Sequence, residues 1–273
     1  MGIRLVTSVV GIAAVIVILY FLPSWVLAAV LCLLSALAAY ELLGETGELK
    51  GHPLLYVSCA VAFFVPYLTA YAPKEGSLTL VLFAFGFVAF VMGIFDYKRV
   101  TFDKLAMSFM GAFVLPYFLS SLLRIYEGAG ELGKYYILMP CIAAWVSDML
   151  AYAVGRLCGK HKLAPHVSPK KTIEGSIGGL LGGAAGIVIF GLCMDHFFNT
   201  GFSVLPLFIA GIFGVAAGQL GDLSMSLIKR NVGIKDFGRI FPGHGGVLDR
   251  FDSILFTAPL FELYLIAANI IGV

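Results

Sequence analysis

The feature that most constrains this chain is a series of apolar stretches, each long enough to cross a lipid bilayer. A transmembrane helix needs about 20 consecutive apolar residues. Only 12% of the 273 residues are charged, whereas soluble domains carry about 25%. A bilayer solvates apolar side chains directly. The sequence predicts an all-α polytopic integral membrane protein with about nine transmembrane helices, near residues 4–22, 24–43, 54–72, 78–95, 104–123, 135–155, 174–194, 203–227 and 251–272.

The distribution of lysine and arginine predicts how these helices are oriented. Cytoplasmic loops hold an excess of both residues. With the N-terminus inside and the spans alternating, only Lys74, Arg124 and Lys134 of the 18 lysines and arginines fall outside. This split favours a cytoplasmic N-terminus and an external C-terminus. The stretch 4–22 is long for a signal peptide and lacks an A-x-A-like site after it, so we expect a retained helix.

Glycines recur at helical spacing in the seventh and eighth stretches. Small residues in such rows let helix backbones approach closely. We expect close packing within one chain and, from the same rows and the large apolar faces, a homodimer. The rows are Gly175, Gly179 and Gly183; Gly178, Gly182 and Gly186; and Gly211, Gly214, Gly218 and Gly221.

Carboxylates within or beside the apolar stretches are the first candidates for function. A charged group at the centre of a bilayer costs about 2.5–3.5 kcal/mol or more. Asp148 and Asp222 lie in the cytoplasmic halves of two predicted spans, while Asp249 and Asp252 begin the last one. An aspartate has too short a stem to reach water easily. We therefore expect a functional acidic group on the cytoplasmic side.

Two cytoplasmic segments complement these acids. In the first, Ser168–Thr172, we expect Ser168 to cap the seventh helix and Pro169 to take its first position. Lys170, Lys171 and the helix amides then form a phosphate cradle, although a plain cap with positive-inside charges is an equal alternative for this segment alone. The second segment, residues 229–250, combines basic residues with Asp236 and a glycine-flanked His244.

These residues together predict a metal-assisted site for a phosphate-bearing substrate. Paired carboxylates with open geometry suit Mg²⁺, which also takes substrate phosphate oxygens. The sequence has no Walker A motif, no G-x-G-x-x-G fingerprint and no zinc-type Cys/His cluster. The net charge of +2, without a long basic tail, favours no nucleic-acid partner. This reasoning does not name the substrate.

The second segment lies within a longer pattern, S-x-x-K-R-x4-K-D-x7-H-G-G-x2-D-R-x-D, which runs from Ser226 to Asp252. It closely resembles the signature of the phosphatidate cytidylyltransferases, also called CDP-diacylglycerol synthases. A second stretch, from Asp148 through Gly155-Arg156 to Ser168–Gly175, is similar to that family too. The resemblance is strongest over about residues 145–255 and shows no departure within the signature.

The resemblance implies that phosphatidic acid attacks the α-phosphorus of CTP, giving CDP-diacylglycerol and pyrophosphate with Mg²⁺. Whether a second cation binds beside Mg²⁺ is left open by the sequence. It implies Asp222 and Asp249 as metal ligands, Asp148, Asp236 and Asp252 near the metal, and a hydrogen bond from His244 to phosphate. The residues expected to hold substrate are Ser168, Lys170, Lys171, Thr172, Lys229, Arg230 and Arg250.

Two other functions remain as alternatives. A CTP-dependent polyprenol or lipid kinase would share acids and lysine-rich loops but leave CDP. An ion-coupled transporter would use intramembrane aspartates, but we find no convincing inverted repeat. We expect residues 1–125 to hold five helices and residues 126–273 to hold four helices and the catalytic site. The expected location is a bacterial inner membrane, with an organelle membrane as the alternative.

Overall fold

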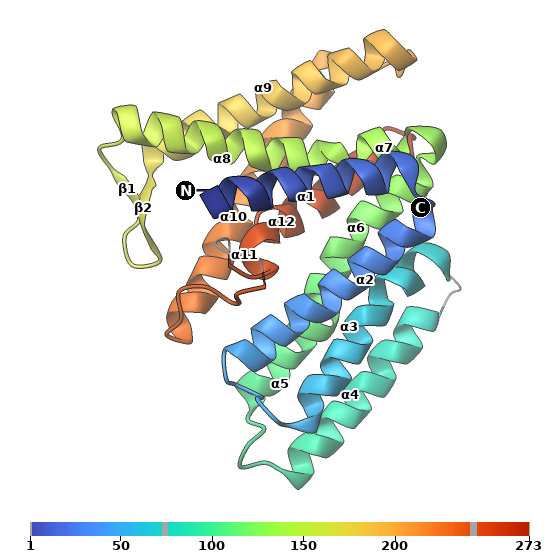
Figure 1. The fold of residues 1–273 in the computed structure, drawn as a ribbon, viewed down its shortest axis with the longest axis vertical. Helices are drawn as coiled ribbons and strands as arrows, with labels where there is room; N and C mark the ends of the chain where they lie inside the picture. The colour runs from blue at the N-terminus through green and yellow to red at the C-terminus, as the bar shows by residue number, and fades with distance from the viewer. Residues whose placement is uncertain (1, 73–75, 241–244, 273) are drawn as a thin grey trace. The chain divides into compact units, whose positions relative to one another are not determined.

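The structure is a computed structural model that describes residues 2–72, 76–240 and 245–272, with the backbone alone for residues 2–8. It folds into two compact units (Figure 1). The first comprises Met1–Glu127 and Val232–Phe251, and the second comprises Gly128–Asn231 and Asp252–Val273. The predicted assignment of the catalytic site to residues 126–273 stays a prediction.

The described part of the chain is almost entirely helical and apolar. It contains seven helices long and apolar enough to cross a membrane, in addition to the shorter apolar helices Val9–Phe21 and Ile254–Ala267. These match the nine predicted stretches and confirm a polytopic, all-α membrane protein. The last stretch is shorter than predicted, because the chain takes a left-handed conformation at Asn269 (φ 56°) just beyond the helix, and such a residue ends a helix.

The first unit holds the N-terminal helices. They are α1 (Gly2–Phe21), α2 (Ser24–Tyr40), the π-helical turn η1 (Glu41–Glu45), α3 (Pro53–Tyr71), α4 (Ser77–Phe95), α5 (Phe102–Phe109), the π-helical turn η2 (Met110–Val114) and α6 (Leu115–Gly128). The short helix α11 (Leu248–Phe251) also belongs to this unit. Figure 1 shows α3 lying between α2 and α4. In its core, Gly111 of η2 lies against Leu42 and Leu43 of η1.

The second unit is built around three long helices. Its elements are the 3-10 turn η3 (Gly130–Leu132), α7 (Gly133–Tyr136), α8 (Leu138–Cys158), the strands β1 (Lys162–Ala164) and β2 (Ser168–Thr172), α9 (Ile173–Phe198), α10 (Val204–Asn231) and α12 (Ile254–Ala267). The two strands pair antiparallel, with Lys162 opposite Thr172 and Ala164 opposite Ser168. Helix α9 packs along both α8 and α10.

The glycine rows bring these helices together, which confirms close packing within one chain. A Cβ atom at Gly179 would lie 2.8 Å from the Ser147 carbonyl oxygen of α8. One at Gly211 would lie 2.8 Å from the Ala184 Cα of α9. Real Cβ atoms do not approach backbone so closely, so the helices meet at these positions only because the residues are glycines.

We expect Gly211→Ala to destabilise the second unit. The added methyl group meets the backbone of Ala184, which cannot rotate away, and overpacking of this kind costs about 1–3 kcal/mol. The measurement is the unfolding temperature in detergent, with Gly11→Ala as the control, because nothing lies within 4 Å of a Cβ at Gly11. Equal unfolding temperatures for the two variants would contradict the prediction.

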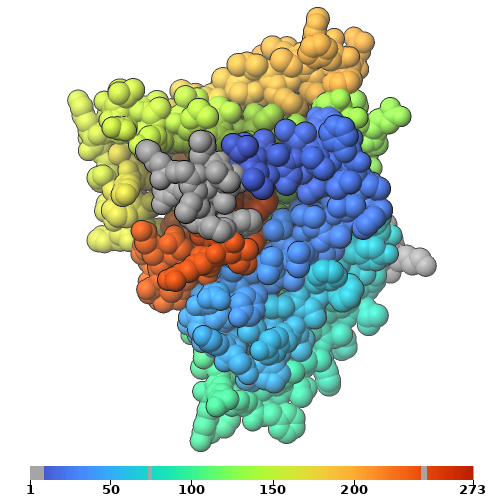
Figure 2. All heavy atoms as spheres, in the orientation of Figure 1, coloured from blue at the N-terminus to red at the C-terminus, as the bar shows by residue number. Residues whose placement is uncertain are grey.

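Large apolar side chains are exposed on the outside of both units. They include Trp25, Phe64 and Phe83 on α2, α3 and α4, and Trp145, Leu181 and Phe213 on α8, α9 and α10. Figure 2 shows the outer face of α2 and α3 in blue and pale blue. Exposed apolar surface on this scale suits lipid rather than water. The chain is an integral membrane protein.

Candidate functional site

Helix α9 begins later than the sequence predicted. Ser168 and Pro169 lie in strand β2 and do not cap the helix, so that expectation was wrong. The cap is Thr172, whose hydroxyl accepts a hydrogen bond from the Gly175 amide at 3.2 Å. The reason is cross-strand pairing: Ser168 lies opposite Ala164, which keeps the Ser168–Thr172 segment extended until its last residue.

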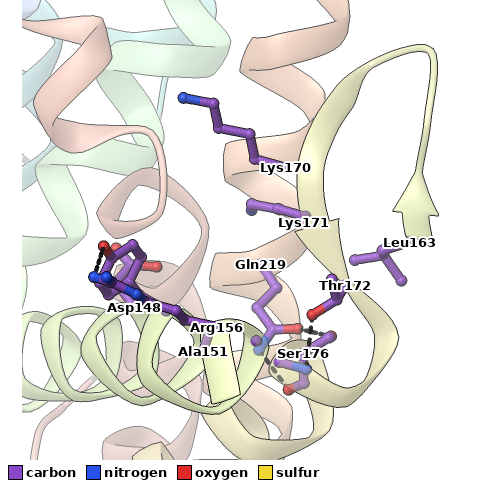
Figure 3. A pocket seen from close by; sticks show the side chains of 12 residues that line it. Asp148, Ala151, Arg156, Leu163, Lys170, Lys171, Thr172, Ser176 and Gln219 are labelled. Carbon is purple, nitrogen blue, oxygen red and sulfur yellow. Dashed lines mark hydrogen bonds between the residues drawn. The ribbon is translucent and has the colours of Figure 1, made fainter. Parts of the chain in front are cut away.

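The hairpin and three helices enclose a pocket of about 320 Å³ in the second unit. Figure 3 shows Lys170 and Lys171 extending from β2, Asp148 and Arg156 lying on α8, and Gln219 lying on α10. The pocket therefore combines three cationic side chains with a carboxylate. Its lining residues are Asp148, Ala151, Tyr152, Gly155, Arg156, Leu163, Lys170, Lys171, Thr172, Gly175, Ser176 and Gln219.

A polar network fixes the floor of this pocket. The Gln219 side chain accepts a hydrogen bond from the Ser176 hydroxyl. It donates to the Ser176 carbonyl oxygen at 3.0 Å and to the Ser147 hydroxyl at 3.3 Å. One half-buried side chain of α10 thus links α8 and α9. Such networks hold a single helix arrangement when their groups are satisfied.

Asp222 follows Gln219 by one turn of α10 and pairs with a lysine of the pocket. Its carboxylate forms an ion pair with the Lys171 ammonium group, and the Ser226 hydroxyl donates to its Oδ1 at 3.4 Å. Both charged side chains are roughly three-quarters shielded from solvent. The structure thus brings together two residues that the sequence assigned to different roles, a metal ligand and a phosphate-binding residue.

Asp252 lies in the turn before α12, in the same electrostatic environment as Asp222. Desolvation raises the pKa of the Asp252 carboxyl to about 7, and the negative charges of Asp222 and Asp148 act in the same direction. The Ser253 amide, which donates to its Oδ1 at 2.8 Å, and the charge of Lys229 lower this pKa. A cation bound here would relieve the repulsion between the carboxylates.

The remaining candidates of the second unit lie at the end of α10. Lys229 is buried, with 8% of its surface exposed. Arg230 is exposed, and its Nε donates to the Val167 carbonyl oxygen of the hairpin turn at 3.4 Å. This contact joins the end of α10 to the loop between β1 and β2.

Asp236, Asp249 and Arg250 belong to the first unit. The Oδ2 atom of Asp249 accepts hydrogen bonds from the amides of Phe237 at 2.8 Å and Gly246 at 3.0 Å. Asp249 is therefore held by backbone within its own segment. Asp236 and Arg250 are exposed. His244 lies outside the described residues, and its predicted role stays a prediction.

The carboxylate oxygens of the site are ligands that suit Mg²⁺, although the site offers few of them. Among the described residues, no group of three or more His, Cys, Asp or Glu side chains is arranged to hold a metal ion. Mg²⁺ needs only one or two carboxylates, because it keeps several waters and binds phosphate oxygens. Within the second unit, Asp222 lies beside the pocket through its ion pair with Lys171 and could offer its carboxylate to the ion, with substrate oxygens completing the coordination. The predicted role of Asp249 as a second ligand stays a prediction.

Sequence reasoning missed Glu41, the most deeply buried acid of the described residues, with 0% of its surface exposed. It lies in the apolar stretch that continues from Ser24 to Glu45. The signal was present in the sequence, since an acid within an apolar stretch is costly and marks a function.

The fold and the site define a polytopic helical membrane protein with a pocket suited to phosphate groups. A model of the cytidylyltransferase family matches residues 2–268. The phosphatidate cytidylyltransferases of Staphylococcus saprophyticus and Staphylococcus epidermidis are 40% identical over 185 residues, 68% of each chain. That of Staphylococcus haemolyticus is 48% identical over 134 residues, 49% of this chain and 50% of the relative. The chain belongs to the cytidylyltransferase family and is a nucleotidyltransferase, which confirms the resemblance.

Proposed function

We propose that the protein is a phosphatidate cytidylyltransferase that converts CTP and phosphatidic acid to CDP-diacylglycerol and pyrophosphate. The observation that carries the proposal is the pocket where Lys170, Lys171 and Arg156 gather beside the carboxylates of Asp148 and Asp222. Cations of this kind bind phosphate groups. The names of the similar bacterial proteins support the choice of substrates.

The reaction joins one phosphate oxygen to one phosphorus. An oxygen of the phosphatidic acid phosphate forms a bond to the α-phosphorus of CTP, and the bond from that phosphorus to the bridging oxygen breaks. Pyrophosphate leaves with the electron pair. Because the nucleophile is already anionic near neutral pH, the protein's task is to position two anions and offset their charge. Mg²⁺, when bound, would polarise the α-phosphate and stabilise the departing pyrophosphate.

Different residues of the second unit would bind the phosphate groups and hold the helices in place. Lys171 reaches both the pocket and Asp222, so it would bind a phosphate oxygen beside the metal. Lys170 and Arg156 line the same pocket and would hold the rest of the triphosphate. Gln219 fixes the helices that carry these groups.

The test uses purified protein, phosphatidic acid, Mg²⁺ and CTP labelled at either the α- or the γ-phosphate. We expect α-label in the lipid and γ-label in pyrophosphate, and no transfer when EDTA removes the metal. The kinase alternative gives the reverse pattern, with γ-label in the lipid and α-label in CDP. Transport of a solute without pyrophosphate release would support the transporter instead.

The orientation and assembly belong to the same proposal. The site faces the cytoplasm of a bacterial inner membrane, where CTP is present, and the protein is a homodimer. The lysine and arginine distribution supports the orientation. Cysteine labelling of intact cells at Lys74 and Lys160 tests it, because only the Lys74→Cys variant should react from outside. Native mass spectrometry tests the dimer.

We expect Lys171→Met to lower kcat/KM for CTP by about 10- to 100-fold, since one hydrogen bond to a charged group contributes about 1.5–3 kcal/mol. Lys160→Met is the matched control, because Lys160 is exposed and does not line the pocket. Initial rates over a range of CTP concentrations measure both. An equal loss in the two variants would show that Lys171 acts only as surface charge.

A further inference from the structure

Glu41 is a carboxylate enclosed in an apolar part of the first unit. It is the first residue of the π-helical turn η1, which continues helix α2. Its side chain is fully buried, and taking a carboxylate out of water costs several kcal/mol unless partners offset the loss. Single turns of π-helix within α-helices are frequent at functional sites. The partners of Glu41 therefore indicate what it does.

Those partners lie about two hundred residues further along the chain. The Val247 amide donates to Oε1 at 2.8 Å, and the Leu248 amide donates to Oε2 at 2.9 Å. These amides begin the short helix α11, and the first amides of a helix have no partner within it. Each carboxylate oxygen of Glu41 thus takes one backbone donor of the signature segment, which we define as the described residues 232–240 and 245–251.

At two positions of the signature segment, the Glu41 carboxylate leaves no room for a side chain. A Cβ atom at Gly246 would lie 2.4 Å from Glu41 Oε1, and one at Gly238 would lie 2.5 Å from the same atom. Neither glycine has a positive φ, whereas Gly245, the residue before Gly246, does, at 90°. Gly245 is required for its backbone conformation, but Gly238 and Gly246 are required because the carboxylate lies against them.

The Glu41 contacts lead directly to Asp249. The Gly246 amide donates to Asp249 Oδ2, and Gly246 itself packs on the Glu41 carboxylate. We propose that Glu41 is a positioning residue, which anchors the signature segment and so sets the place of Asp249 and Arg250 for the cytidylyl transfer. This inference rests on the proposed function. Glu41 does not touch the substrate in it, and acts through the backbone of residues 246–248.

The main test is Glu41→Gln, which keeps the shape of the side chain. Its single carbonyl oxygen accepts one amide, but its NH₂ group then faces the other N–H. Mutating a residue that orients a metal ligand costs about 10- to 100-fold in metal affinity or activity, and Glu41 orients Asp249 through the backbone. We expect kcat to fall by that factor and the Mg²⁺ concentration for half-maximal rate to rise, while KM for phosphatidic acid changes less than about twofold.

Glu45→Gln is the matched control. Glu45 ends the same π-helical turn and is exposed, so its variant should keep the wild-type rate and Mg²⁺ dependence. Gly246→Ala is a second test that leaves the carboxylate in place, and it should raise the Mg²⁺ requirement as Glu41→Gln does. Because both changes disturb one contact, their effects should not add in the double variant.

Hydrogen–deuterium exchange tests the anchor without using activity. In lipid nanodiscs, peptides covering residues 245–251 should exchange faster in Glu41→Gln than in wild type or Glu45→Gln. Unchanged exchange overturns the anchor, and faster exchange with wild-type kcat and Mg²⁺ dependence overturns the positioning role. Wild-type protein without activity would overturn the proposed function instead, and the exchange rates would still decide whether Glu41 holds the segment.

Discussion

Asp222→Asn is expected to abolish transfer of α-label from CTP to lipid, with a loss of about a thousand-fold or more. The change removes a negative charge that pairs with Lys171 and lies near Asp252. A metal ion contributes several kcal/mol of transition-state stabilisation, and each 1.4 kcal/mol is about tenfold in rate. Asn keeps the size of the side chain, so the loss would come from charge and coordination rather than packing.

Ser224→Ala is the control for this prediction, because Ser224 lies on the same helix and its hydroxyl only donates to the Leu220 carbonyl oxygen of the preceding turn. Both variants should keep the wild-type unfolding temperature within a few degrees. The rates are measured across a wide range of Mg²⁺ concentrations. If Asp222→Asn recovers the wild-type rate at high Mg²⁺, Asp222 contributes only to metal affinity. If the rate of Asp222→Asn equals that of wild type at every Mg²⁺ concentration, Asp222 has no role in the site.

The apolar stretches predicted most of the fold because the bilayer simplifies the problem. In lipid, a long apolar stretch has to satisfy its own backbone hydrogen bonds, and a helix does so. The helices Pro53–Tyr71 and Ile173–Phe198 begin and end within a few residues of the predicted stretches. The glycine rows likewise predicted close contacts, since their helical spacing places them on one face of α9 or α10.

Features that depend on distant residues could not be predicted in the same way. Ser168 and Pro169 have the residue types of a helix start, but pairing with β1 keeps them extended. Glu41 is bonded to residues about two hundred positions away, and no local pattern connects them. The sequence identified the acids and bases of the signature segment, but not the side chain from the second apolar stretch that holds it.

Asp249→Asn is expected to reduce activity as severely as Asp222→Asn, but through a different combination of causes. Oδ2 of Asp249 accepts two backbone hydrogen bonds, and leaving a buried donor without a partner costs about 1–3 kcal/mol. If the amide nitrogen of Asn takes the place of Oδ2, both donors lose their acceptor. We therefore expect loss of transfer together with local loosening of the signature segment.

Exchange measurements separate the two aspartates. Peptides that contain Phe237 or Gly246 should exchange faster in Asp249→Asn, whereas Asp222→Asn should leave them unchanged, because Asp222 makes its contacts with Lys171 and Ser226. Both variants should lose activity. If Asp249→Asn were inactive with wild-type exchange, its carboxylate would act on the metal alone. If it were active with fast exchange, the signature segment would not need its fixed geometry, which would contradict the role of Glu41 as well.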